Sequence, residues 1–220
     1  MAAVSSEREP TEQHGPNWQR LLPNADASPT LRCCLLSGGG SRRMGHDKAL
    51  LPHPEGGTWL SRSLLLLAQL EAPITLLSRW PEHLSLASAL GVNGLEAWRE
   101  PPPHEGPLLA LHRLMQHHSE QRLLLCPVDM PHLNLAVLET LLTAAAQQAG
   151  VACVAHDGQR CQPLLGLYPN TTPQRAELNQ LVERGERRLQ TWLEQQPLQT
   201  VQLEPAAIQN INHAAELDIT

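Results

Sequence analysis

The stretch LRCCLLSGGGS, residues 31–41, decides the fold. Its first part, Leu31–Leu36, is a short and almost wholly apolar run, which is typical of a strand buried on both faces. The glycines that follow predict a loop whose backbone N–H groups converge on one place, because residues without a Cβ adopt positive φ at little cost. A buried strand that runs into such a loop indicates an α/β protein with a phosphate-type loop.

The rest of the chain alternates between short apolar runs and helical patterns. Further strands are predicted at Ile74–Ser78, Leu95–Trp98, Arg122–Pro127, Val151–Ala155, Leu164–Tyr168 and Val201–Leu203. Helices are predicted at Trp59–Leu70, His83–Leu90, Leu108–His117, Leu135–Ala149 and Leu189–Glu194, with one more opened by Thr172-Pro173. Because parallel strands need crossover helices, the alternation predicts a Rossmann-like three-layer α/β fold with a mainly parallel central sheet. In such sheets, ligands bind beyond the carboxyl ends of the strands.

Composition indicates the domain organisation and excludes several classes of protein. Residues 1–30 are polar and rich in proline, which predicts a flexible N-terminal extension before one domain at residues 31–220. The 16 basic and 22 acidic residues give a net charge of −6, which argues against a nucleic-acid binder. The chain has neither an apolar run long enough for a membrane span nor a secretory signal. Five cysteines without a C-x-x-C pair predict reduced thiols in a cytoplasmic protein.

The loop after the first strand also carries positive charge. Arg42, Arg43 and Lys48 lie within a few residues of the three glycines, and a triphosphate needs such charge beside it. The pattern is neither G-x-x-x-x-G-K-[ST] nor G-x-G-x-x-G, so neither of the two common nucleotide-loop patterns is present. The loop therefore indicates a nucleotide site of another type.

The segment SGGGSRRMGHDKALL, residues 37–51, resembles the signature of nucleotidyltransferases of the sugar-nucleotide type. Within that group it is most similar to the molybdenum cofactor guanylyltransferases, since Gly38-Gly39 stands where cytidylyltransferase relatives typically have Ala-Ala-Gly. The resemblance extends from Leu31 to Leu217. Its other motifs are, in order, Gly106-Pro-Leu108, Cys126-Pro-Val-Asp-Met-Pro131, His156-Asp-Gly-x-Arg-x-x-Pro163, Gly185-Glu-Arg-Arg188 and Asn210-Ile-Asn212.

The resemblance implies a nucleotidyltransferase-type fold and a reaction. GMP would pass from GTP to the terminal phosphate of Mo-molybdopterin, giving the guanine dinucleotide form of the cofactor and pyrophosphate. The reaction would require Mg²⁺. Its partners would be GTP and Mo-molybdopterin, together with other cofactor-biosynthesis proteins and apo-molybdoenzymes, with no nucleic acid and no membrane. Because both reactants are anions, the protein would act by positioning them and neutralising charge.

The resemblance also assigns roles to the catalytic residues. Lys48, with Arg43 as a second cation, would contact the phosphates. Asp129 follows the strongest buried strand and would bind Mg²⁺, a cation that takes one or two carboxylates beside phosphates and water. The nucleotide-binding set also includes Asn210 and Asn212, although His213-Ala214 follows them where the family usually has Thr-Pro.

The guanine would be bound at the glycine end of the loop. The resemblance implies contacts from the backbone of Leu36, Ser37 and Gly38, with Gly39 beside them. An acidic residue before Gly-Pro-Leu contacts the nucleoside in the family; Glu100 is the candidate here, and Arg99 competes with it for that position. A carboxylate can accept from guanine N1–H and N2–H₂, a pattern that cytosine lacks. Ser78 falls where the family often has Asn.

Two other functions stay open on the sequence. One is a cytidylyltransferase of the same fold, acting on molybdopterin or on another phosphorylated acceptor. The other is a non-catalytic carrier that binds the pterin or a nucleotide and passes it to an apo-enzyme. Lys48 and Asp129 argue against the carrier, because a catalyst needs that pair and a carrier does not. The assignment requires Lys48 and Asp129 to lie in one place in the folded chain.

Overall fold

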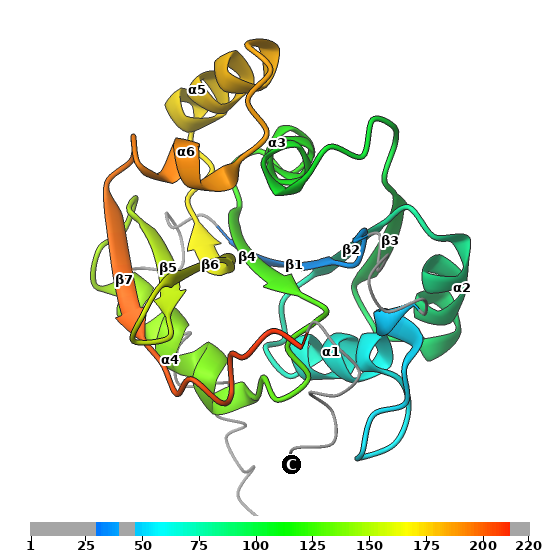
Figure 1. Ribbon diagram of the computed structural model, residues 1–220. Helices are drawn as coiled ribbons and strands as arrows, with labels where there is room; N and C mark the ends of the chain where they lie inside the picture. Colours follow the sequence, from blue (N-terminus) through cyan, green and yellow to red (C-terminus); the bar gives the residue numbers. More distant parts are fainter. Residues whose placement is uncertain (1–29, 40–46, 212–220) are drawn as a thin grey trace, which may run out of the picture.

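A seven-stranded sheet forms the centre of the molecule (Figure 1). The computed structural model describes residues 30–39 and 47–211. The strand order is β3-β2-β1-β4-β6-β5-β7, and within it only β6 is antiparallel to its neighbours. The strands are β1 (Leu31–Leu36), β2 (Ile74–Ser78), β3 (Leu95–Arg99), β4 (Arg122–Pro127), β5 (Ala152–His156), β6 (Cys161–Tyr168) and β7 (Leu198–Gln202). The structure confirms the predicted α/β fold with a mainly parallel sheet.

Helices cover both faces of this sheet. One face packs against α1 (Trp59–Ala68), α2 (Pro81–Leu90) and α4 (Leu135–Ala146). The other face packs against α3 (Pro107–His117), α5 (Thr172–Glu183) and α6 (Leu189–Leu193). A short 3-10 helix, η2 (Lys48–Leu50), lies between β1 and α1. Within the described residues, no helix has both the length and the apolar character needed to cross a bilayer.

The apolar runs of the sequence form two cores, one on each side of the sheet. β1 and β4 are almost completely buried, because a central parallel strand is covered on both faces. Their side chains alternate between the two cores. Cys33 and Leu35 face α1 and α4, whereas Cys34 faces α3. All five cysteines are free, and four of them are buried.

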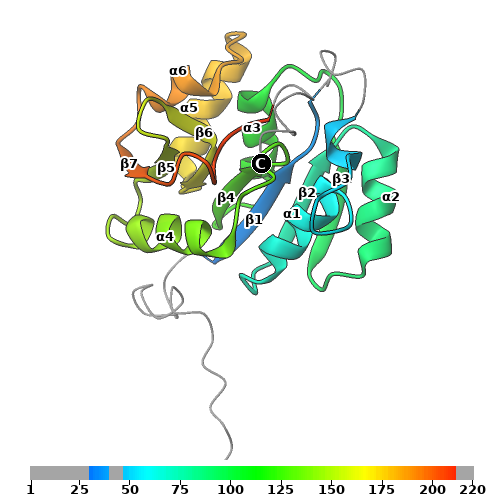
Figure 2. The same ribbon diagram turned by 60° about the horizontal axis from the view of Figure 1, so that its bottom comes forward.

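The C-terminal part of the described chain returns to the centre of the sheet. After β7, the N–H of Leu203 donates to the carbonyl of His156, and the segment then runs towards β4 (Figures 1 and 2). There the N–H of Ile211 donates to the carbonyl of Asp129 at 3.0 Å. Ile208 and Ile211 are buried, which anchors this segment by apolar contact. The chain therefore brings residues from its C-terminal end to the loop after β4.

Several element boundaries differ from those expected from the sequence. α2 begins at Pro81 rather than His83, because proline occupies the first turn of a helix, where its missing N–H is not needed. β6 begins at Cys161, three residues early, and β7 spans 198–202 instead of 201–203. β7 is an edge strand with half-exposed alternation, which gives a weak apolar signal. The 3-10 helix η2 has no counterpart among the predicted elements.

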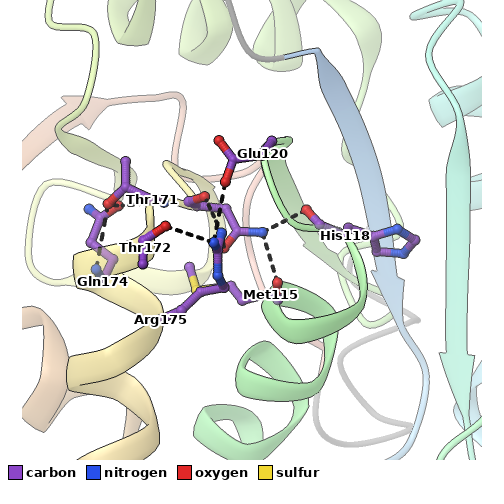
Figure 3. Close-up of polar contacts among 8 residues, drawn as sticks. Met115, His118, Glu120, Thr171, Thr172, Gln174 and Arg175 are labelled. Carbon is purple, nitrogen blue, oxygen red and sulfur yellow. Dashed lines mark hydrogen bonds and ion pairs between the residues drawn. The ribbon is translucent and has the colours of Figure 1, made fainter.

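A polar network far along the chain from the glycine loop joins α3 to α5 (Figure 3). The buried amide of Asn170 donates to the carbonyls of Met115 at 3.0 Å and His118 at 2.7 Å, at the end of α3. Arg175 of α5 donates to the backbone carbonyl of Asn170 at 2.8 Å and to Glu120 at 3.2 Å. The Asn170 amide thus gives the carbonyl of Met115 a donor and gives the carbonyl of His118 a second donor beside the N–H of Gln121.

We expect Asn170→Ala to destabilise the fold by about 1–3 kcal/mol, because it removes the side-chain donor of the Met115 carbonyl and one of the two donors of the His118 carbonyl. Urea denaturation of the full chain measures this change. Asn179→Ala is the matched control. Asn179 is only partly buried, and its side chain forms hydrogen bonds with the side chains of His112 on α3 and Glu183 on α5. Equal stability losses in the two variants would show that the Asn170 amide has no special role.

Candidate active site

The candidate site lies where the chain leaves β1 and β4 at their carboxyl ends. Leu36 of β1 pairs with Pro127 of β4, and the N–H of Val128 donates to the carbonyl of Leu36 at 3.2 Å. β1 lies between β2 and β4, so the chain winds outward from here in both directions. Open α/β sheets bind their ligands at such a switch point. Ser37–Gly39 and Asp129 leave the sheet side by side at this place.

Asp129 presents a carboxylate with a free oxygen at this switch point. Its Oδ1 atom is buried and has no hydrogen-bond partner among the described residues. Burial raises the pKa of the Asp129 carboxyl, while the positive charge of Lys48 and a hydrogen bond from the Asp129 backbone N–H act to lower it. A buried carboxylate oxygen without a donor is costly, so its presence in a folded protein suggests a ligand for it.

Lys48 lies close to Asp129 and is tied to the same segment. Its Nζ atom donates to the carbonyl of Ile211 at 2.7 Å, and the N–H of Ile211 donates to the carbonyl of Asp129. The peptide groups on either side of Ile211 therefore bridge the lysine and the aspartate. Lys48 is also the only lysine of the 220-residue chain. The structure thus meets the requirement that Lys48 and Asp129 lie in one place.

Glu100 lies against the backbone of the glycine loop. A Cβ atom built on Gly38 would lie 2.8 Å from Oε2 of Glu100, which is closer than real Cβ atoms come. Arg113 of α3 donates to Oε1 of Glu100 at 2.9 Å and holds the carboxylate in this position. Glu100 is buried, whereas Arg99 is exposed. Of the two candidates, it is therefore Glu100 that reaches the loop, and Gly38 leaves space for it.

Gly39 contrasts with Gly38. It is exposed, and among the residues that the structure describes an added Cβ would meet nothing within 4 Å. Crowding by these residues therefore does not require a glycine at position 39. Leu36 and Ser37 precede these glycines at the end of β1, where Leu36 is half-buried and Ser37 is buried.

Asn210 joins the returning segment to the β5–β6 hairpin. Its side-chain amide donates to Oε1 of Gln162 at 3.1 Å, and Gln162 in turn donates to Asp157 at 2.7 Å. Hydrogen bonds from the backbone N–H groups of Arg160 and Gln159 lower the pKa of Asp157 to about 2. The motif His156–Pro163 therefore forms the turn that supports Asn210. This contact holds the segment one residue before Ile211.

Two predicted site residues, Arg43 and Asn212, lie outside the described residues. Lys48, Asp129 and Ile211 come together, and Glu100 and Gly38 come together beside the end of β1. Within residues 30–39 and 47–211, no three His, Cys, Asp or Glu side chains gather as a metal centre. A Mg²⁺ site differs from such a cluster, because it needs only one or two protein carboxylates.

Sequence reasoning missed one residue of this region, His83. It is 1% exposed and contacts both Ser37 and Asp47, the residue before Lys48. No motif marks it, because a single histidine early in a helix has no spacing to a partner in the sequence. A helix start at Pro81, which the proline itself favours, would have placed His83 in the first turn beside the carboxyl end of β2.

Comparisons with known proteins identify the fold and the family of this chain. A structure from Archaeoglobus fulgidus, titled molybdopterin-guanine dinucleotide biosynthesis protein A, superposes with a TM-score of 0.64 over 84% of this chain and 94% of that chain. At 20% identity this likeness concerns the fold. The fold and the curated relatives together define a nucleotidyltransferase.

Residues 33–201 match the family described as MobA-like NTP transferase domain, and the chain belongs to this family. A relative from Rhodopirellula baltica is 34% identical over 208 residues, which are 91% of this chain and 96% of that protein. A second relative, from Mycobacterium bovis, is 31% identical over 188 residues, covering 83% of this chain and 89% of that protein. Both relatives carry the name "Probable molybdenum cofactor guanylyltransferase".

Proposed function

We propose that this protein transfers GMP from GTP to the terminal phosphate of molybdopterin, with pyrophosphate as the second product. The observation that carries the proposal is the juxtaposition of Lys48 and Asp129 through the peptide groups of Ile211. A cation and a carboxylate at a switch point suit a nucleotide triphosphate with its metal. The names of the curated relatives supply the identity of the nucleotide and of the acceptor.

Asp129 fits the role of a Mg²⁺ ligand. Its buried Oδ1 atom lacks a hydrogen-bond donor among the described residues, and a carboxylate oxygen is the ligand that Mg²⁺ prefers. Bound there, the cation would neutralise charge on the phosphate oxygens. Lys48, close to Asp129, would add a second positive charge for the phosphates. The carboxylate, in turn, would need no further protein donor once its free oxygen is engaged.

The base of the nucleotide would lie at the end of β1. The backbone of Gly39 is exposed, whereas the half-buried backbone of Gly38 has the Glu100 carboxylate beside it. Glu100 lies beside Gly38 and is held by Arg113, so its carboxylate has a fixed position. A carboxylate accepts from both N1–H and N2–H₂ of guanine. This arrangement supports guanine over cytosine.

The chemistry that these residues support is an in-line displacement at the α-phosphorus. An oxygen of the acceptor phosphate forms the new P–O bond, and the bond from the α-phosphorus to the bridging oxygen breaks, so that pyrophosphate leaves with the bonding electrons. Since both reactants are anions, the contribution of Lys48 and Asp129 is to hold them together and offset their charge. No side-chain nucleophile is required.

The experiment supplies the full chain with GTP, Mg²⁺ and molybdopterin and measures pyrophosphate release together with the mass of the product. We expect the guanine dinucleotide and one pyrophosphate per turnover. A preference for CTP would assign the protein to the cytidylyltransferases. Tight binding of molybdopterin or nucleotide by folded protein without any pyrophosphate would make it a carrier. Omission of the acceptor is the blank in each case.

We expect Glu100→Gln to lower kcat/KM for GTP by roughly 10- to 100-fold, since hydrogen bonds to a charged group contribute about 1.5–3 kcal/mol. In the variant, the NH₂ group of the glutamine would face the N–H groups of guanine, and two donors cannot form a hydrogen bond with each other. Steady-state kinetics with GTP and CTP measure the change, and the ratio of the two kcat/KM values should fall.

Arg99→Gln is the control for this substitution, because Arg99 is adjacent in sequence but exposed at the end of β3. We expect it to leave the GTP/CTP ratio unchanged. If Glu100→Gln kept the wild-type ratio, Glu100 would not read the base.

A further inference from the structure

His83 occupies a buried position between two parts of the candidate site. It is the third residue of α2 and is 1% exposed. On one side of its ring, Nδ1 lies 2.8 Å from Oγ of Ser78 and 3.0 Å from Oγ of Ser37. On the other side, Nε2 lies 2.8 Å from Oδ2 of Asp47. Both ring nitrogens are therefore engaged, and their partners come from three different parts of the chain.

The two sides of the ring belong to the two halves of the site. Ser37 ends β1 and is followed by Gly38, which lies against Glu100. Asp47 is followed by Lys48, which is bound to the carbonyl of Ile211. A single rigid imidazole thus spans from the end of β1 to the start of η2. Ser37 and Asp47 are ten residues apart in the chain, whereas through His83 they are connected by two hydrogen bonds.

Asp47 transmits this constraint to Lys48. Its Oδ2 atom contacts His83, and its Oδ1 atom accepts from the N–H of Ala49 at 3.0 Å, which caps η2. The N–H of Leu50 also donates to the carbonyl of Asp47. With both carboxylate oxygens engaged, the orientation of Asp47 fixes the turn that carries Lys48.

The proton of His83 can be placed so that each of these side chains has a partner. With the proton on Nε2, the ring donates to Asp47, and Nδ1 accepts from the hydroxyl of Ser37. The hydroxyl of Ser78 then donates to the carbonyl of Ser37, 2.8 Å away. Nδ1 also lies 3.1 Å from that carbonyl oxygen, a contact in which a protonated Nδ1 would be the donor. A fully satisfied buried polar network of this kind holds its members in one arrangement.

We propose that His83 is a positioning residue for the nucleotide. By fixing the Asp47–Lys48 turn relative to Ser37–Gly38, it sets the distance between the part of the site that binds the base and the part that binds the triphosphate. One GTP molecule then meets both parts at once. This inference rests on the proposed function, because it concerns the same nucleotide site. His83 itself is buried, and it acts through Asp47 and Ser37.

The test separates the two halves of the ligand. For each variant, kcat/KM for GTP is measured together with inhibition constants for guanosine and for tripolyphosphate, which each fill one part of the site. If His83 positions the two parts, His83→Asn should lower kcat/KM for GTP by roughly 10- to 100-fold, as expected for misplaced binding groups. The inhibition constants of the two fragments should stay within about threefold, since neither spans both parts.

His83→Gln is the conservative variant. The amide of glutamine reaches the place of Nε2 and can still donate to Asp47, whereas the shorter asparagine reaches only the place of Nδ1. We expect His83→Gln to recover most of the lost kcat/KM. Because both variants keep a polar amide at this buried position, a difference between them reports on the contact with Asp47 rather than on a loss of folding.

His118→Gln is the matched control. His118 is also buried, and its Nε2 atom lies 3.0 Å from a hydroxyl on β2, that of Thr75. It has no contact with Asp47 or Ser37, so its loss should lower stability without changing the relation between GTP and the two fragments.

Three results would overturn the proposal: wild-type kinetics in His83→Asn, equal losses in the Asn and Gln variants, or a parallel loss of GTP and both fragments. A wild-type protein that does not turn over GTP would instead overturn the proposed function.

Discussion

Replacement of Lys48 by alanine should lower GTP turnover about 100- to 1000-fold, which corresponds to a loss of about 3–4 kcal/mol of transition-state stabilisation. The ammonium group lies beside Asp129 and at the switch point of the sheet, where the phosphates would be bound. Its hydrogen bond to the carbonyl of Ile211 involves a charged donor and contributes about 1.5–3 kcal/mol to folding. We therefore expect a folded but less stable protein with a large loss of activity, measured by pyrophosphate release and by thermal unfolding.

Arg62→Ala is the control for Lys48, because Arg62 is an exposed cation on α1 that pairs with Glu55. It should retain wild-type turnover. Since Lys48 is the only lysine in the chain, reductive methylation also provides an independent measurement. One internal amine should be modified, and GTP should protect it. Wild-type turnover in Lys48→Ala, or modification unaffected by GTP, would remove this residue from the site.

Asp129→Asn should reduce Mg²⁺-dependent turnover by at least about 100-fold, because the metal loses its carboxylate ligand. The same change should stabilise the metal-free protein at pH 7. Burial raises the pKa of Asp129 in the folded chain. Such a group favours the fold below its unfolded pKa, and this contribution is lost as the pH rises through the folded pKa. At pH 7 the charged, buried carboxylate therefore weakens the fold.

Thermal unfolding without metal, from pH 8 downwards, measures this effect. The stability difference between Asp129→Asn and wild type should shrink as the pH falls towards about 3.9, the ordinary aspartate value. Asp157→Asn gives the opposite sign, because backbone hydrogen bonds lower the pKa of Asp157 to about 2. The Asp157 carboxylate stabilises the fold at pH values above the pKa of aspartate in the unfolded chain. This stabilisation disappears as the pH falls through the lower pKa that Asp157 has in the folded chain. A destabilised but active Asp129→Asn protein would contradict the assignment.

The sequence was sufficient to predict the central strands and to propose Lys48 and Asp129 as site residues. β1, β2 and β4 have the predicted boundaries, because buried parallel strands are continuous apolar runs with turn residues after them. Lys48 and Asp129 were assigned from motifs that follow two of these strands, and strand ends are where α/β sheets place their ligands. The roles of both residues came from the family resemblance, which required them to lie in one place.

The supporting residues could not be predicted in this way. The contribution of His83 depends on hydrogen bonds to Asp47 and Ser37. These residues lie 36 and 46 positions before it in the chain, and no spacing rule connects them to it. Glu100 was separable from Arg99 only by burial, which depends on how β3 ends. The edge strand β7 and the short helix η2 have few buried residues, and hydrophobic periodicity is weak in both.

Ile211 contacts the proposed catalytic pair, Lys48 and Asp129, through main-chain atoms: its N–H donates to the carbonyl of Asp129, and its carbonyl accepts from Lys48. Its side chain only fills a buried space, so most apolar residues would serve equally well there, whereas proline would remove the N–H. The residue type at position 211 is therefore free to vary among apolar residues, whereas the length of the segment between β7 and this position is constrained. Insertions and deletions in this tail, rather than substitutions, are the changes that natural selection would remove.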